Sequence, residues 1–350
     1  MSTESDTIVR TVNARRSVPV PASAKAGWSF VGAGTIATEL MVEAIRAIGH
    51  SPLWVVSQNK IDAANFAQDL GIPHSTTDVD RALQDPSVGF AYISARLKRR
   101  PHYISAAAGA RKHILCDGPI SDNSRSAKTL VTLCNQAGAS LAVNQPLRAS
   151  TIHQTMRRLI SDGDIGTVRS IVLLRGGPYH GPLTRRARDA DEGGGIYLDV
   201  SVEDIDLARF LTAAEPLEVT ATSAPFDAAP SQLAYTVRLS NGCLFQAYES
   251  FSTADIESMV MVAGDRGALI AQGTMNGRAS GTLLRRTDGK SELVPVREHD
   301  FQVSTVKDFV NTRSREASWL SGGSDSVTAL LVVEAMMISA KRRRAVPING

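Results

Sequence analysis

The sequence predicts two domains: an α/β domain with a parallel sheet, then an α+β domain with a large, mostly antiparallel open sheet. Two patterns indicate this organisation. Short apolar runs alternate with helical segments over residues 28–148, whereas strands follow one another without helices over much of 149–350. A chain of 350 residues, with 43% hydrophobic and 21% charged residues, is long and apolar enough for two cores.

The first domain is predicted from strands that alternate with helices, the pattern of right-handed βαβ units in a parallel sheet. The expected strands are 29–32, 53–57, 90–94, 113–116 and 141–144. The expected helices between them are 38–48, 63–70, 102–108 and 124–136.

The second domain is predicted to open with a helix at 151–161, a strand at 168–174, a polar glycine-rich loop and a helix near 199–211. The turn Ser240-Asn241-Gly242 joins two of the strands that follow and indicates antiparallel pairing. Because broad open sheet faces commonly pair between subunits, a homo-oligomer (dimer or tetramer) is expected. The later strands are 217–222, 234–239, 244–249, 259–262 and 269–271, and the closing helices are 305–313 and 327–341.

Composition limits the classes of partner. Residues 1–27 are rich in Ser, Thr, Ala, Arg and Pro, so a disordered leader is expected, with a subunit-embracing arm as the alternative. The formal charge of +3 is small and dispersed, which argues against nucleic acid. No apolar run reaches about 18 residues, so no membrane span is expected. Three cysteines without a C-x-x-C pair predict neither disulfides nor a metal site and fit a cytoplasmic location.

The first predicted strand passes into the first helix through FVGAGTIA, residues 30–37, which has the pattern G-x-G-x-x-A. Gly32 permits the tight turn, and Gly34 lets the backbone approach phosphate groups closely. The N–H groups of Thr35 and Ile36 at the helix start favour a bound anion. An ordinary βα turn is the alternative, but the surrounding alternation favours a Rossmann domain that binds a dinucleotide.

The loop after the second strand discriminates between NAD and NADP. In such folds an acidic residue about 20 positions past the glycines binds the ribose 2′-hydroxyl and favours NAD. This chain has no carboxylate there until Asp62; Ser57 and Asn59 are able to donate to a 2′-phosphate, and Lys60 is able to neutralise it. NADP is therefore favoured over NAD, with a solvated helix-start charge as the alternative for Lys60.

Four blocks of sequence, taken together, resemble one family. They are residues 32–37, 113–119, 144–148 and 193–204. In order and spacing they are similar to the Gfo/Idh/MocA oxidoreductases, and most similar to the 1,5-anhydro-D-fructose reductase-like branch. The resemblance implies a Rossmann domain, a C-terminal sheet domain and reversible hydride transfer between NAD(P) and a sugar-like alcohol or ketone.

The chain departs from that family at the acid/base residues. The usual Glu-Lys-Pro motif falls on 117–119, so Gly118 replaces the lysine that binds substrate and assists proton transfer. The usual Asp-x-x-x-His motif falls on 199–203, so Glu203 replaces its histidine, and Arg100 stands where another histidine is common. Hydride transfer to a ketone leaves an alkoxide that takes a proton from a positioned acid, and Gly118 cannot supply one.

Glu203 is the first candidate for the replacement acid/base, because burial near a nicotinamide raises a carboxyl pKa towards neutral pH. Asp199 lies one turn earlier on the same helix face. Tyr179 and His180, in the loop 176–191, are further candidates for handling the proton. The alternatives are a polar helix face for the two acids and a solvated loop for the other two residues.

Residues at strand ends are expected to contact the cofactor. Ser94 and Ala95 would do so through their backbone. Asp117 would bond to a ribose hydroxyl, and Pro119 would shape the loop around the nicotinamide. Asn144 would border the cleft between the domains.

Three arginines are substrate-binding candidates. Arg148 is expected to border the interdomain cleft, and Arg185 with Arg186 makes the 176–191 loop basic, which suits a substrate carboxylate or phosphate. A charged surface loop is the alternative. The leading hypothesis is an NAD(P)-dependent oxidoreductase for a small polar, sugar-like carbonyl or alcohol, with a non-standard proton donor. The alternatives are a cofactor-binding pseudo-enzyme or regulator, and a lyase or hydrolase that uses bound NAD transiently.

Overall fold

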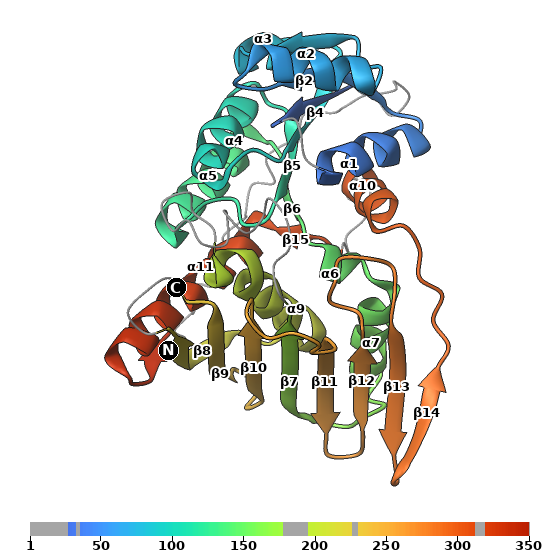
Figure 1. The fold of residues 1–350 in the computed structure, drawn as a ribbon, viewed down its shortest axis with the longest axis vertical. Helices are drawn as coiled ribbons and strands as arrows, with labels where there is room; N and C mark the ends of the chain where they lie inside the picture. Colours follow the sequence, from blue (N-terminus) through green and yellow to red (C-terminus); the bar gives the residue numbers. More distant parts are fainter. Residues whose placement is uncertain (1–26, 33–35, 178–194, 226–229, 312–318, 350) are drawn as a thin grey trace, which may run out of the picture.

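The computed structural model describes residues 27–32, 36–177, 195–225, 230–311 and 319–349. It contains two sheets, one above the other in Figure 1, each with helices packed against it. The α/β domain followed by an α+β domain is confirmed. The expected leader lies almost wholly outside the described residues.

The first sheet has seven strands in the order β15-β6-β5-β4-β1-β2-β3. All neighbours are parallel except β15, which is antiparallel to β6. Parallel strands covered on both faces read as continuous apolar runs, which is why most of them are visible in the sequence. The strands are β1 Gly27–Val31, β2 Ser51–Val56, β3 His74–Thr76, β4 Val88–Ile93, β5 His113–Asp117, β6 Leu141–Asn144 and β15 Ser321–Gly322.

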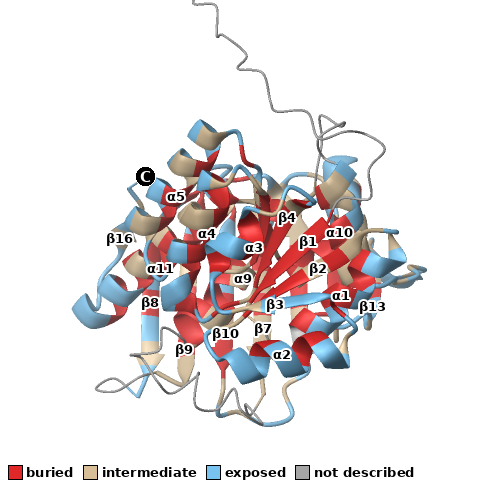
Figure 2. Ribbon diagram, turned by 90° about the horizontal axis from the view of Figure 1, so that it is seen from above, coloured by how far each residue is buried: buried red, intermediate tan, exposed pale blue. Residues whose placement is uncertain are grey.

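Helices cover both faces of this sheet. One face packs against α1, α2 and α10, and the other packs against α3, α4 and α5. Figure 2 shows the buried central strands β1 and β4 among helices whose outer faces are exposed. The helices are α1 Ile36–Ala47, α2 Lys60–Asp69, α3 Val79–Leu83, the 3-10 turn η1 Leu97–Arg99, α4 Arg100–Gly109, α5 Ser124–Ala137 and α10 Phe301–Asn311.

The second sheet has nine strands in the order β14-β13-β12-β11-β7-β10-β9-β8-β16. Every pairing is antiparallel except that of β7 with β10, so the sheet is mixed. The ends of β7 and β10 point towards the first domain (Figure 1). The strands are β7 Val168–Gly176, β8 Pro216–Ala224, β9 Gln232–Leu239, β10 Leu244–Ser250, β11 Met259–Gly264, β12 Ala268–Gln272, β13 Thr282–Thr287, β14 Lys290–Val294 and β16 Val346–Pro347.

One face of this sheet packs against helices and the other is open. Along β7, Ile171 and Leu173 are buried, whereas Val172 and Leu174 on the opposite face are only partly covered. This alternation is typical of a sheet with one solvated face. The elements associated with this domain are α6 Pro146–Ala149, α7 Thr151–Ser161, the π-helical turn η3 Tyr197–Ser201, α9 Val202–Thr212 and α11 Gly323–Arg342.

The chain crosses between the two sheets after residue 148. Helix α10 packs on α1, and β15 adds the last strand to the first sheet before α11 begins. Residues beyond 149 therefore complete the first domain, whereas the expected boundary ends that domain at residue 148.

Helix α11 has the length and apolar content to span a membrane, with a mean hydropathy of 1.3 over its most apolar window. The sequence analysis did not expect such a segment. The helix packs against α5, α9 and β8. Buried core residues such as Leu330, Val333 and Met336 lie along it, so core packing accounts for its apolar character.

Candidate functional site

The glycine turn after β1 is held tightly against the end of β4. Gly32 has a φ of +98°, and a Cβ at this position would lie 2.5 Å from the backbone nitrogen of Ala95. The hydroxyl of Ser94 donates to the Gly32 carbonyl at 2.7 Å and lies 2.8 Å from the hydroxyl of Thr38 in α1. Only glycine fits this approach. The turn thus places the start of α1 beside two strand ends, as binding of a dinucleotide pyrophosphate requires. Ile36 begins α1, while Gly34 and Thr35 lie outside the described residues.

The loop after β2 contains the residues expected near the adenosine ribose. Ser57 is half-buried and Lys60 is exposed at the first position of α2. Asn59 is the N-cap of α2, and its Oδ1 accepts from the Ile61 N–H at 2.8 Å. This side-chain oxygen is therefore committed to the helix, a role that the sequence analysis did not include.

Arg99 supplies a second cation at this loop and was not among the candidate residues. The side-chain amide of Gln58 faces the guanidinium of Arg99, and with its oxygen on that side it accepts from Arg99. The run of cations from Arg96 to Arg100, directly after a strand of the Rossmann sheet, is the signal that could have revealed it.

Polar groups meet at the carboxyl ends of β4, β5 and β6. The phenol of Tyr92 donates to Oδ1 of Asp117 at 2.6 Å, and the amide of Asn144 donates to the same oxygen at 3.1 Å. Three strands thus hold the Asp117 carboxylate in one orientation at the sheet edge where ligands bind in such folds.

Arg100 joins the backbone segments that follow β4 and β5. Its buried guanidinium donates to the carbonyls of Ala95 at 2.9 Å, Asp117 at 2.9 Å and Pro119 at 2.7 Å. The residue at the family histidine position therefore fixes the backbone that is expected to contact the cofactor, and it has no route to a substrate.

Gly118 leaves little room for a larger side chain. A Cβ there would lie 3.1 Å from Cγ1 of Val143 and 3.3 Å from Nε2 of Gln145. The amide of Gln145 thus lies against the space that a side chain at position 118 would enter. This glutamine was not among the candidates; its place directly after β6 and Asn144 is the signal that could have suggested it.

Glu203 lies in the first turn of α9 and forms an ion pair with Arg175. Its Oε2 accepts from Nη2 of Arg175 at 2.9 Å, and its side chain is 25% exposed. The other terminal nitrogen of Arg175 binds Oδ1 of the fully buried Asp204 at 2.8 Å. Burial raises the pKa of Glu203, while the neighbouring guanidinium opposes this effect. One arginine therefore divides its charge between two carboxylates.

Asp199 lies in η3, one turn before Glu203. Its carboxylate accepts from the backbone N–H of Gly195 at 3.0 Å and so closes the turn that precedes α9. The negative charge of Asp199 also contributes to the raised pKa of Glu203. The catalytic role expected for Asp199 stays a prediction.

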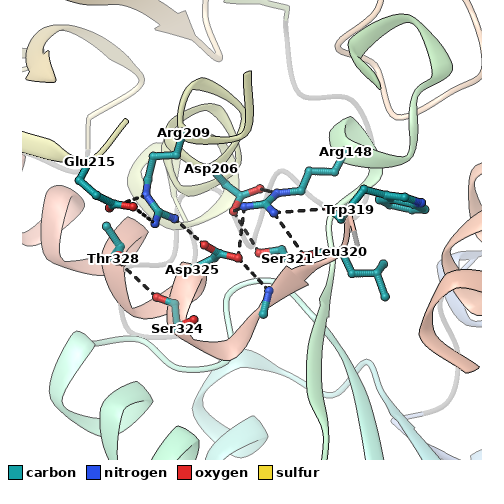
Figure 3. A network of polar contacts seen from close by, with 11 residues as sticks. Arg148, Asp206, Arg209, Glu215, Trp319, Leu320, Ser321, Ser324, Asp325 and Thr328 are labelled. Atoms are coloured by element: carbon teal, nitrogen blue, oxygen red, sulfur yellow. Dashed lines mark hydrogen bonds and ion pairs between the residues drawn. The ribbon is translucent and has the colours of Figure 1, made fainter. Parts of the chain in front are cut away.

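Arg148 is buried in a network that joins three parts of the chain (Figure 3). Its Nε and Nη2 bind the carboxylate of Asp206 at 2.6 and 2.7 Å, and Nη2 lies 3.3 Å from Asp325. Its Nη1 donates to the carbonyls of Trp319 and Leu320 at 3.4 and 3.3 Å. The expected substrate-binding role does not fit this arrangement, because the whole guanidinium is committed to holding α6, α9 and the start of α11.

Four candidates lie outside the described residues, so they remain predictions. They are Tyr179, His180, Arg185 and Arg186.

A cavity of about 450 Å³ lies at the end of the second sheet that faces the first domain. Arg175 lines it and so connects it to Glu203. Its other polar lining comes from two serines and one amide, and its apolar lining includes Phe251, so it suits a small hydroxylated molecule. Within the described ranges, no three His, Cys, Asp or Glu side chains are grouped as a metal ion would require. The polar lining residues are Ser250, Ser258 and Asn276.

A Rossmann domain with a glycine turn, beside a sheet domain that presents a carboxyl group and a polar cavity, defines a nicotinamide-dependent oxidoreductase. Two family models match the chain. One, for an oxidoreductase family with an NAD-binding Rossmann fold, matches residues 27–145; the other, for a GFO/IDH/MocA C-terminal domain, matches residues 153–270. The chain belongs to the Gfo/Idh/MocA oxidoreductase family.

Its relatives include enzymes named for sugars and polyols. A 1,5-anhydro-D-fructose reductase from Ensifer adhaerens is 29% identical over 329 residues, covering 92% of this chain and 98% of the relative. An inositol 2-dehydrogenase from Rhizobium meliloti is 26% identical over 258 residues, covering 70% and 76%. The aldose-aldose oxidoreductase of Caulobacter crescentus, solved with glycerol, shares the fold, with a TM-score of 0.82 and 21% identity over 92% of this chain and 99% of that one.

Proposed function

We propose that this protein transfers a hydride between NADP(H) and a small sugar-like carbonyl or alcohol, with Glu203 as the proton donor. The observation that carries this proposal is the Glu203–Arg175 pair at 2.9 Å, because its arginine also lines the cavity. Glu203 occupies the position at which the family has its histidine.

A bound nicotinamide would supply the hydride that the substrate's carbonyl carbon takes up, which would leave a negative charge on the carbonyl oxygen. Protonated Glu203 gives its proton to that oxygen and becomes a carboxylate. Arg175 already contacts Oε2, so it stabilises the carboxylate as it forms. In the oxidative direction the same carboxylate accepts the proton of the alcohol.

The missing ammonium group predicts a slow enzyme. A positioned cation or donor at a developing alkoxide contributes several kcal/mol to catalysis. Gly118 provides neither, and the polar group beside it is the amide of Gln145. This observation also favours a second candidate function, a protein that binds cofactor as a regulator and has lost the chemistry.

The preference for NADP rests on two cations at the loop after β2. Lys60 is exposed at the start of α2, and Arg99 reaches Gln58 in the same loop. Guanidinium groups bind phosphate through paired hydrogen bonds, and nearby carboxylates that would repel a 2′-phosphate are absent between 57 and 61.

A cytoplasmic homo-oligomer is part of this proposal. The partly covered face of the second sheet supports self-association, and the three cysteines, all buried and unpaired, support a reducing compartment.

The test compares the wild-type protein with Glu203→Gln. We expect NADPH to bind more tightly than NADH by calorimetry, and NADPH to be consumed with at least one ketose, aldose or keto-polyol. Glu203→Gln should lower kcat at least 100-fold while the NADPH Kd changes less than threefold, because general acid catalysis contributes about 10²–10⁴-fold.

Other outcomes identify the alternatives. Tight cofactor binding without turnover of any substrate would support the regulator. Turnover with bound NAD and no net consumption of nicotinamide would support the lyase or hydrolase.

A further inference from the structure

Behind Glu203 lies a third carboxyl group, that of Glu249 on β10, and it is fully buried. The hydroxyl of Tyr235 lies 2.7 Å from its Oε1, and the hydroxyl of Ser201 lies within hydrogen-bonding distance of Oε2. The charge of Asp204 on α9, which is also fully buried, acts on Glu249 from a different element. Two acids thus meet in the core.

Asp204 is the second buried acid of this group. Its Oδ1 binds Arg175, but its Oδ2 is buried and has no N–H or hydroxyl donor among the residues that the structure describes. A buried carboxylate oxygen without a donor is costly. A proton on Glu249 would give this buried group a further donor, and Oδ2 is the oxygen of Asp204 that lacks one.

We propose that Glu249 holds a proton at neutral pH and donates a hydrogen bond to the carboxylate of Asp204. Asp204 therefore stays ionised and keeps its ion pair with one of the two terminal nitrogens of Arg175. The proposal rests on the role given to Glu203 above. With Arg175 and Asp204 balancing each other and Glu249 neutral, the buried group is neutral only when Glu203 is also protonated. The pair thereby keeps Glu203 able to act as a proton donor, which makes Asp204 and Glu249 positioning residues.

Other groups around Glu249 agree with this assignment. Tyr235 from β9 and Tyr197 from η3 are the remaining titratable side chains that interact with it, and burial raises the pKa of both phenols, so they stay neutral. Burial likewise raises the pKa of Glu249 well above its ordinary value, and the charge of Asp204 adds to this effect. Arg175 on β7 opposes it weakly.

The first test needs no enzyme activity. A group with a raised folded-state pKa stabilises the protein below its unfolded pKa, and this contribution is lost as the pH rises through the folded value. Relative to Glu249→Gln, which copies the protonated form, the Tm of the wild type should therefore fall by about 2–3 °C per pH unit above pH 5. The difference infrared spectrum at pH 7 should show a carboxylic-acid C=O band that Glu249→Gln removes.

Glu218→Gln, at a surface carboxyl of β8, two strands away from β10, is the control and should change neither measurement. A Tm difference between wild type and Glu249→Gln that does not vary with pH, or the absence of the acid band, would overturn the proposal even if the enzyme proves active.

The second test links the pair to Glu203. In Asp204→Asn the full charge of Arg175 acts on Glu203 and lowers its pKa, so the pH above which reduction fails should move down by about one unit. Glu218→Gln should not move it. An unchanged profile in a folded Asp204→Asn variant would overturn the positioning role, whereas absence of turnover in the wild type would overturn only the proposed function.

Discussion

At the scale of single residues, Gly118 lies where the sequence resemblance predicts a lysine. The surrounding strands and loops keep the geometry of a nicotinamide site, with Asp117 held by Tyr92 and Asn144. Under the proposed function, the proton would come from Glu203, which is paired with Arg175.

A lysine at position 118 tests this account. Its Cβ would contact Val143 and displace the amide of Gln145, which has a flexible side chain. Because the ammonium would stabilise the alkoxide, we expect Gly118→Lys to raise kcat at least about tenfold. Gly118→Met is the control, since it has a similar length without charge; steady-state kinetics on the best substrate measures both. Equal rates for the two variants would show that the site does not use a cation there.

At the scale of elements, the structure contains the predicted strands and helices, in the predicted order, wherever the sequence segment is apolar. The helix at 151–161 agrees residue for residue with α7. The pattern did not predict β3, α3, β13 or β14. β3 and α3 are only three and five residues long, and β14 is exposed at the sheet edge with no apolar alternation. Helices α10 and α11 each begin four residues earlier than expected, and for α11 the reason is a first turn made only of glycine and polar residues.

The site was harder to predict than the fold because its contacts join distant segments. Periodicity places Glu203 on a helix but gives no indication that Arg175, 28 positions earlier, is its partner. The same holds for Arg148, whose carboxylate partner Asp206 is 58 positions away. Sequence motifs identify which residues are unusual, and only the packing shows which of them are structural.

The Arg148 network makes a prediction about the junction of α6, α9 and α11. Removing one partner of a buried ion pair leaves an uncompensated charge, so Arg148→Met should lower the free energy of unfolding by about 3–5 kcal/mol. Arg158→Met is the matched control: its pair with Asp162 is exposed and should contribute less than about 1 kcal/mol. Chemical denaturation followed by circular dichroism measures both. Similar losses for the two variants would contradict a structural role for Arg148.

At the scale of the whole molecule, the open face of the second sheet is the surface most suited to self-association. The strand register aligns Val172, Met261, Ile270 and Leu284 in one apolar row across four neighbouring strands. We expect the wild type to be a dimer or tetramer and Met261→Glu to dissociate it, because a charge in the middle of that row would be desolvated. Light scattering after size exclusion measures the mass. Lys290→Glu, on the exposed edge strand β14, is the control, and a monomeric wild type would contradict the expectation.

The passage of the chain between its two sheets has a consequence for how ligands enter and leave. It crosses after β6, returns before α10, and crosses once more between β15 and α11. Within the described residues, three covalent connections thus join the two sheets, and the Arg148 network links the one at α6 with the one at the start of α11. A wide hinge opening of the two domains would have to extend all three connections at once. We therefore expect coenzyme exchange to require only small, local movements of loops. The rate of turnover should then depend only weakly on solvent viscosity.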